Sequence, residues 1–157
     1  MPSKTTKTTG PQQVDVRGPR FNAWVSSGVI VAALLASAVS NVVAAIVLGL
    51  QAVVFAIGAL GGPRQHPYGR IFAAFVAPRL GPVTEREPVP PLKFAQFVGL
   101  LFAVAGAAGF AFGVPTLGLV ATAFALIAAF LNAAFGICLG CQLYPFIARF
   151  RRTPSPA

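Results

Sequence analysis

Acidic side chains are almost absent from this sequence: its 157 residues include three Asp and Glu residues in all, and a single histidine. Enzymes that use a pair of carboxylates as general acid and base need such groups close together, as do metal sites built from carboxylates and imidazoles. The sequence also lacks a P-loop, a dinucleotide-binding fingerprint, an H-E-x-x-H motif and a nucleophilic-serine elbow. We therefore expect neither a cofactor nor a resident metal ion.

Charge of either sign is scarce. Charged residues make up 10% of the chain and apolar residues 56%, whereas a typical soluble domain has roughly 25% charged residues. No charged side chain occurs between Phe21 and Leu60. Because about 20 apolar residues suffice to cross the hydrocarbon core of a bilayer, this composition is typical of a membrane protein.

The charges that are present are mostly positive, with a net charge of +9. In a soluble protein this excess would favour nucleic acid as a partner. Here every Lys and Arg flanks an apolar run instead of forming a basic stripe. Anionic lipid head groups are the better match, at about 1 kcal/mol for each basic residue near the surface. We expect membrane lipid, and no nucleic acid, as a partner.

The apolar runs predict four membrane-spanning helices joined as two hairpins. The run from Phe21 to Leu60 is about twice as long as one span, and the polar segment Ser37–Asn41 divides it. Gly61-Gly62-Pro63 ends the second helix, because glycines followed by proline do not easily continue one. We expect an all-α membrane protein, a four-transmembrane-helix bundle with helices at about 22–39, 42–60, 93–112 and 116–137.

The segment from Arg64 to Lys93 is a long internal loop rich in arginine and proline. Within it, residues 68–80 predict a short amphipathic helix in the membrane interface, because four apolar residues share one helical face: Phe72, Phe75, Val76 and Leu80. The proline-rich stretch that follows predicts an extended linker.

Residues 14–150 are expected to form one membrane domain. They are flanked by a disordered tail at 1–13 and a basic tail at 151–157, which have too little apolar surface to fold alone. Small residues recur at every fourth position of the third and fourth predicted helices, at Ala95, Gly99, Ala103, Ala107 and Ala111, and at Ala121, Ala125, Ala129 and Ala133. Such stripes let helix backbones approach closely.

The basic residues also predict the orientation in the membrane. All twelve Lys and Arg fall before the first helix, in the central loop or after the fourth helix, and an excess of positive charge marks the cytoplasmic side. We expect a multi-pass protein of the plasma membrane with both termini in the cytoplasm. A competing interpretation is a signal peptide cleaved at Ala36-Ser37-Ala38, which would leave the cysteines on the same side.

Cys138 and Cys141 form a Cys-x-x-Cys pair and are the main candidates for chemistry. At this spacing two side chains share a helical face, and paired cysteines in a reducing cytoplasm more often cycle or bind metal than form a structural disulfide. Zinc takes about four ligands. The chain adds only His66, a lone loop histidine expected to be solvated, so a closed zinc site would need a dimer or a partner. The alternative to redox cycling or metal binding is that the two thiols only pack at a helix end.

We expect the pair at the C-terminal end of the fourth helix, where the negative pole of the helix dipole opposes a thiolate. Gly136 and Gly140 can, however, break this helix. Arginines expected on the same surface would stabilise a thiolate or a sulfur oxyanion: Arg17, Arg20 and Arg149. Three amide side chains are expected in the cytoplasmic half of the bundle: Asn22, Gln96 and Asn132. They predict either a polar pocket under the cysteines or interhelical hydrogen bonds of about 1 kcal/mol or less.

Four segments carry a resemblance to a known family: Val14–Asn22, Gly62–Arg64, Pro91–Gly99 and Asn132–Pro145. Together they resemble the bacterial membrane family named domain of unknown function 4395 (DUF4395), over about residues 14–150. Its most specific part is the Gly-x-Cys-x-Gly-Cys-x-x-Tyr-Pro motif that ends at Pro145. The resemblance implies the membrane fold and thioredoxin-like or rhodanese-type cytoplasmic partners, and hence thiol or sulfur handling.

The leading hypothesis is a membrane accessory whose cysteines exchange electrons or sulfane sulfur with a soluble cytoplasmic partner. Cys141 would be the more exposed thiol and Cys138 the resolving one. A second hypothesis is a small-solute permease, which would need a homo-oligomer because four short helices line only a narrow path. A third is a structural membrane subunit that uses only its small-residue faces.

Overall fold

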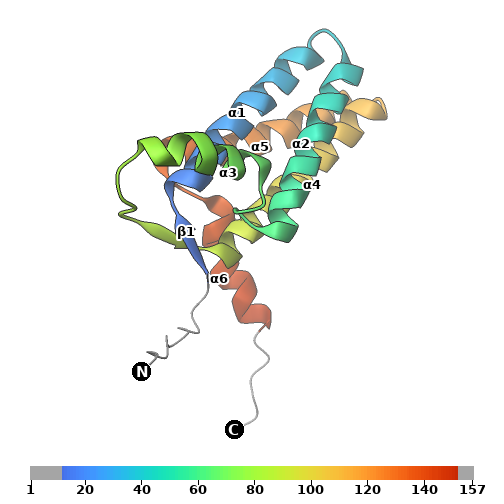
Figure 1. Cartoon of the computed structure of the whole chain (residues 1–157). Coiled ribbons are helices and arrows are strands. Elements are labelled where there is room, and N and C mark those ends of the chain that lie inside the picture. Colours follow the sequence, from blue (N-terminus) through green and yellow to red (C-terminus); the bar gives the residue numbers. More distant parts are fainter. Residues whose placement is uncertain (1–11, 152–157) are drawn as a thin grey trace, which may run out of the picture.

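The computed structural model describes residues 12–151, so residues 1–11 and 152–157 of the two expected tails lie outside it. The elements in chain order are β1 (Gln13–Asp15), α1 (Arg17–Ser37), α2 (Asn41–Gly61), α3 (Pro67–Ile71), a π-helical segment (Phe72–Val76), a 3-10 turn (Ala77–Arg79), β2 (Arg86–Pro88), α4 (Val89–Ala111), α5 (Pro115–Phe135) and α6 (Leu139–Arg151). The long helices pack in the cyclic order α1, α2, α4, α5, so that each contacts two others (Figure 1).

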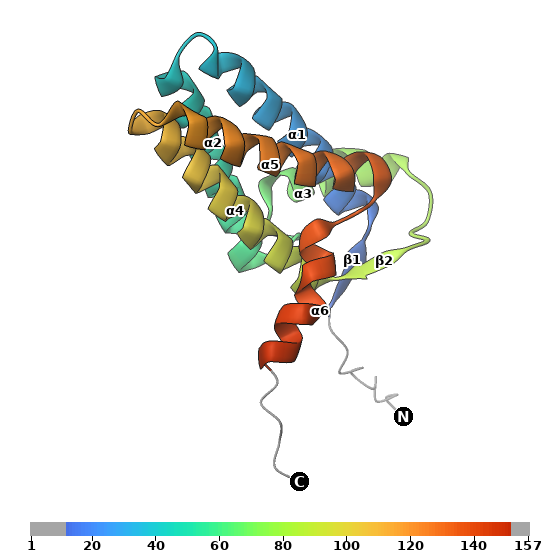
Figure 2. The ribbon, with the colours of Figure 1, turned by 180° about the vertical axis from the view of Figure 1, so that it is seen from behind.

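Four helices are long and apolar enough to cross a membrane, namely α1, α2, α4 and α5, with 21, 21, 23 and 21 residues. At 1.5 Å per residue, these lengths match a hydrocarbon core of about 30 Å. The all-α membrane bundle of two hairpins predicted from the sequence is confirmed. Both views place the two hairpin turns at one end of the bundle and β1, β2 and α6 at the other (Figures 1 and 2).

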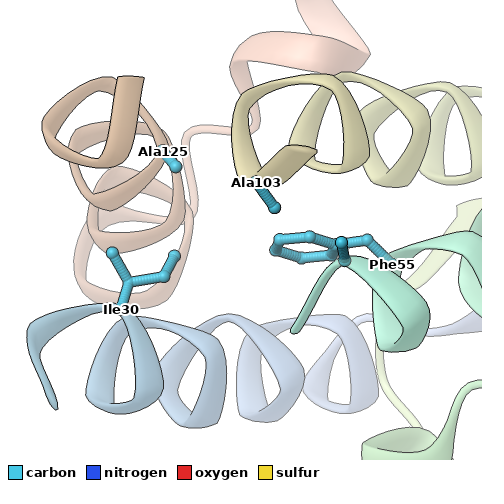
Figure 3. Close-up of a cluster of buried hydrophobic side chains, with 5 residues drawn as sticks. Ile30, Phe55, Ala103 and Ala125 are labelled. Carbon is cyan, nitrogen blue, oxygen red and sulfur yellow. The ribbon is translucent and has the colours of Figure 1, made fainter. Parts of the chain in front are cut away.

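The centre of the bundle is closely packed because small side chains line it. Figure 3 shows one residue from each spanning helix meeting there: Ile30, Phe55, Ala103 and Ala125. At the α4–α5 turn the approach is closer still, since a methyl group added at Gly109 would lie 2.9 Å from the Gly118 Cα. Buried alanines in both predicted stripes, such as Ala103 and Ala133, confirm that these faces pack against other helices.

The helical segment expected at 68–80 is present, but it consists of three successive pieces rather than one helix. The π-helical segment Phe72–Val76 changes the angular spacing of the side chains, so the four predicted apolar residues do not share a face. Phe72 is buried against α1, with its ring 5.7 Å from that of Phe21, whereas Phe75 is exposed. Of the four residues of the expected apolar face, Phe72 is the buried one, and Phe75 and Leu80 are exposed.

Two short strands, which the sequence did not predict, connect the start of α1 to the start of α4. β1 and β2 pair antiparallel, with Val14 opposite Glu87. Asp15 accepts hydrogen bonds from the Arg17 side chain at 2.9 and 3.1 Å. This contact lowers the pKa of the Asp15 carboxyl group below its usual value. The strand pair holds the two hairpins together at the end of the bundle where the cysteines lie.

The α4–α5 contact gives a direct test of the packing. Replacing Gly109 with Ala should destabilise the protein by about 1–3 kcal/mol, because the added methyl group meets the Gly118 backbone. The matched control is Gly28→Ala in α1, where an added methyl group has nothing within 4 Å. Thermal unfolding in detergent should show a lower midpoint for Gly109→Ala alone. Equal midpoints would mean that α4 and α5 do not approach this closely.

Candidate functional site

The two cysteines lie at the junction between two helices. α5 ends at Phe135 because Gly136 takes a left-handed conformation, with φ of 69°, which a residue without a Cβ adopts readily. The Ile137 N–H donates to the Leu131 carbonyl at 3.2 Å and closes the helix end. The chain then runs without helical structure until α6 begins at Leu139 (Figure 2).

This break changes the electrostatic position of the cysteine pair. Cys138 immediately precedes α6, and its Sγ accepts a hydrogen bond from the Cys141 N–H at 3.3 Å. The Cys138 carbonyl accepts the Gln142 N–H at 3.0 Å, in the first turn of α6. The pair therefore lies at the positive pole of α6, which favours a thiolate. The sequence prediction of the negative pole is wrong, because it took residues 136–137 as the end of the fourth helix.

The two sulfur atoms are joined in a disulfide, and the Cα atoms are 5.1 Å apart. The expectation that this spacing brings the sulfurs together is confirmed. Both cysteines are half-buried. The two cysteines thus differ in their surroundings rather than clearly in their exposure, since Cys138 lines two cavities and Cys141 lines neither.

The first turn of α6 is held directly against α4. Gly140 is buried, and a methyl group added there would lie 2.6 Å from the Ala95 Cα. One turn further along α6, the Tyr144 ring lies 6.1 Å from that of Phe94. The glycine between the cysteines therefore has a packing role: without a side chain it lets the Cys-x-x-Cys turn lie on the α4 backbone.

Two cavities meet beside Cys138. The larger has a volume of about 620 Å³, and the smaller about 290 Å³. Both are lined by Cys138 and by the same three amide side chains, Asn22, Gln96 and Asn132. The three amides thus line a pocket beside the cysteines, but its wall is mostly apolar rather than polar.

Polar side chains also connect the helices behind these cavities. The Ser26 hydroxyl donates to the Asn22 Oδ1, and it accepts from the Gln51 Nε2, in both cases at 3.2 Å. The Gln51 Oε1 in turn accepts the Tyr68 hydroxyl at 2.8 Å. This network joins α1, α2 and α3 through Gln51. Asn22 itself bonds within α1, so it takes part in the interhelical network only through Ser26.

His66 is buried rather than solvated, with 1% of its surface exposed. Its Nδ1 accepts the Tyr68 N–H at 3.2 Å, so the proton of the neutral ring is assigned to Nε2. Burial lowers the pKa of the imidazole to about 4, and the neighbouring Gln96 side chain opposes this lowering. The geometry of a hydrogen bond between them is nevertheless not met: within residues 12–151, neither His66 Nε2 nor Gln96 Oε1 has a partner. No sequence pattern predicts this burial, in which the ring packs beside Gly58 of α2 and Gln96 of α4.

The three arginines proposed to stabilise a thiolate have different surroundings. Arg20 donates to the Ala133 and Ala134 carbonyls at the end of α5, at 3.3 and 3.5 Å, and so lies near the cysteine junction. Arg17 is paired with Asp15 and also donates to the Gly81 carbonyl at 3.1 Å. Arg149 is exposed near the far end of α6, about 12 Å along the helix from Cys141 at 1.5 Å per residue. Of the three, Arg20 has the contacts nearest to the pair.

Comparisons with known proteins give one match. The family model described as domain of unknown function (DUF4395) matches residues 14–149. Neither the curated proteins nor the solved structures include a match. Within residues 12–151, no group of three His, Cys, Asp or Glu side chains is placed to hold a metal ion.

The position of Cys138 before α6 predicts unequal thiol reactivity. In the reduced protein, a lone Cys138 (Cys141→Ser) should be alkylated at pH 7 about threefold faster than a lone Cys141 (Cys138→Ser). This factor corresponds to the roughly 0.3–1 kcal/mol by which a helix N-terminus stabilises an anion. Mass spectrometry measures the alkylation rates of the two variants in detergent. The two rates should become equal when the protein is unfolded in denaturant, because α6 is then lost. A faster Cys141 in the folded protein would contradict the assignment.

The buried imidazole predicts a pH dependence of stability. As the pH falls from 6.5 toward 4, the unfolded chain binds a proton at His66 while the folded protein does not, so the free energy of unfolding decreases. The loss should be about 3 kcal/mol at most, from 1.36 kcal/mol per pKa unit. His66→Asn is the comparison variant, because Asn also caps helices such as α3. Its unfolding midpoint should depend less on pH in this window, and an identical dependence would contradict the burial of a neutral imidazole.

Proposed function

Because the chain belongs to the family of domain of unknown function 4395, whose description gives no activity, we propose a function from the geometry of its cysteine pair. The protein is a membrane-bound thiol–disulfide exchange protein that accepts electrons from a soluble dithiol protein. The observation that carries this proposal is the disulfide between Cys138 and Cys141 at the N-terminus of α6. In this position the departing sulfur is stabilised as a thiolate, and such thiols leave faster in disulfide exchange.

The exchange balances without any further reactant. A thiolate of the partner attacks the Cys141 Sγ, the Cys138–Cys141 bond breaks, and Cys138 leaves as a thiolate at the positive pole of α6. The second thiol of the partner, once deprotonated, attacks the mixed disulfide and displaces Cys141. The partner becomes a disulfide, and this chain gains two electrons and two protons. Cys141 is the sulfur that the partner attacks, because it lines neither cavity, and Cys138 is the leaving thiol, which would resolve the mixed disulfide in the reverse reaction.

The chemistry of the site supports a partner of thioredoxin type. The family resemblance points to thioredoxin-like and rhodanese-type proteins, and the positive charge near the cysteine end of the bundle favours the cytoplasmic side of the plasma membrane. Arg20 supports the site by holding the end of α5 beside the junction. A rhodanese-type partner would instead transfer a sulfur atom, which leaves a persulfide rather than a dithiol.

Exchange with reduced thioredoxin tests the proposal. The oxidised full-length chain in nanodiscs should be converted to the dithiol, with one thioredoxin disulfide formed per chain. Alkylation followed by mass spectrometry counts the thiols on both proteins. In the reverse direction, with oxidised thioredoxin, the Cys141 thiolate of Cys138→Ser should attack the thioredoxin disulfide, release one thioredoxin thiolate and accumulate as a mixed disulfide, because the resolving thiol Cys138 is missing. Cys141→Ser should form at least tenfold less of the mixed disulfide.

The controls separate the alternatives. The double variant Cys138→Ser/Cys141→Ser should exchange nothing, while Gly28→Ala should behave as wild type. A mass increase of one sulfur atom after treatment with a persulfide-loaded rhodanese, without dithiol formation from thioredoxin, would favour sulfur transfer and contradict disulfide exchange. Full growth of cells with the double variant under sulfur stress would favour a permease or a structural subunit that does not use the thiols.

A further inference from the structure

The larger cavity has the chemistry of a binding site for a small, uncharged and mostly apolar molecule. Its volume of about 620 Å³ is in the range of small-molecule sites. Phe72 and Leu92, both buried, are among its apolar lining residues. Cys138 lines the same space. A molecule bound there would lie beside Cys138, whereas Cys141, the sulfur that the partner attacks, does not line this cavity.

We propose that this cavity binds a lipid-soluble quinone, which reoxidises the cysteine pair; the proposal rests on the thiol–disulfide exchange described above. Transfer of electrons from the partner leaves the chain as a dithiol, and continued turnover then requires a two-electron acceptor. A quinone is apolar enough for this cavity, dissolves in the surrounding membrane and accepts two electrons and two protons.

The hydrogen-bonding groups in the cavity wall match both redox forms of a quinone. His66 is almost fully buried, and its Nε2–H has no partner within residues 12–151. Because this atom has almost no accessible surface, a quinone carbonyl would accept this bond once the neighbouring Gln96 side chain moves aside, and would then relieve an unmet donor. The Gln96 Oε1, likewise without a partner in that range, is an acceptor for the hydroxyl that forms when the carbonyl is reduced.

The charges around the cavity argue against an anionic ligand at its inner wall. His66 is neutral near pH 7, because its pKa is about 4. The amide side chains of Asn22, Gln96 and Asn132 carry no charge, and Asp15 is paired with Arg17. Arg64 and Arg70 also line the cavity, but both are exposed and therefore belong to its rim. A buried anion would lack a buried cation to offset its desolvation.

The segment beside the cavity offers an apolar approach from the bilayer. Ile71 and Phe75 are 48% and 65% exposed, and they flank lining residues of the cavity. Large exposed apolar side chains of this kind are expected where a membrane protein faces lipid. A quinone could therefore reach the cavity without passing through water.

The reoxidation step conserves atoms and electrons. The two thiols lose two protons and two electrons, and a sulfur–sulfur bond forms between Cys138 and Cys141. The quinone gains the same two electrons and two protons, and its two carbonyl groups become the hydroxyl groups of a hydroquinone. Cys138, which lines the cavity, is the sulfur nearest to the bound ring.

The test uses the reduced full-length chain in nanodiscs with ubiquinone-1 as the probe. Wild-type protein should convert one quinone to hydroquinone per chain, while its two thiols become a disulfide. The loss of quinone absorbance measures this conversion. His66→Asn should raise the quinone concentration for half-maximal rate about tenfold, the effect of one lost hydrogen bond. It should leave the exchange with thioredoxin unchanged.

A second variant keeps the test decisive if His66→Asn unfolds. Ala73 is exposed and lines only the larger cavity, so Ala73→Phe should obstruct it without disturbing the core. The matched control is Ala32→Phe, on an exposed face of α1 that lines neither cavity. Ala73→Phe should slow quinone reduction at least fivefold, and Ala32→Phe should not change it.

The outcomes distinguish the two proposals. If thioredoxin exchange proceeds but no quinone is reduced, the quinone site is wrong and the proposed function stands. If both reactions fail, the proposed function is wrong as well. Equal quinone reduction by wild type, His66→Asn and Ala73→Phe would show that the reaction occurs outside this cavity, and that His66 and Gln96 serve only the packing of the loop.

Discussion

Gly136 determines the electrostatics of the cysteine pair, because its left-handed conformation ends α5 and makes α6 a separate helix. Had α5 continued into α6 as one helix, both cysteines would lie in its interior, away from any positive helix pole. The break also redirects the chain so that Gly140 can rest on Ala95. A single backbone torsion thus places the cysteines at a positive helix pole and α6 against α4.

The buried polar groups follow a pattern that fits a membrane protein with an internal site. Within a bilayer, helices associate largely through close packing and a few hydrogen bonds, and the contacts from Asn22 through Ser26 and Gln51 to Tyr68 supply such bonds. The same packing satisfies these groups but leaves His66 Nε2 and Gln96 Oε1 unpaired among the described residues. Unpaired buried groups are unfavourable for stability. The two side chains neighbour each other and line the larger cavity, so the proposed quinone would give both atoms a partner.

The spans could be predicted from the sequence because the length of an apolar run is a local property. The position of the cysteines relative to a helix pole could not, because it depends on the φ angle of Gly136, and a glycine can either continue a helix or end it. The burial of His66 was missed for a different reason. A histidine between Gln65 and Pro67 resembles any loop residue, and only the packing of Gln96 from α4 removes it from water. The pocket of amide side chains was predictable, since helix topology alone puts Asn22, Gln96 and Asn132 at one level of the bundle.

The two cysteines also divide their surroundings in a way that suits a carrier between two phases. Cys141 lines neither cavity, so a soluble protein can approach it without entering the bundle, while Cys138 lines both cavities at this end of the bundle. A disulfide that joins these two environments can take electrons on one side and release them on the other. Only the bond between the sulfurs has to open and close for this, so α6 can stay fixed on α4 throughout. The close packing at Gly140, which a mobile lid would not permit, is then a requirement of the proposed chemistry.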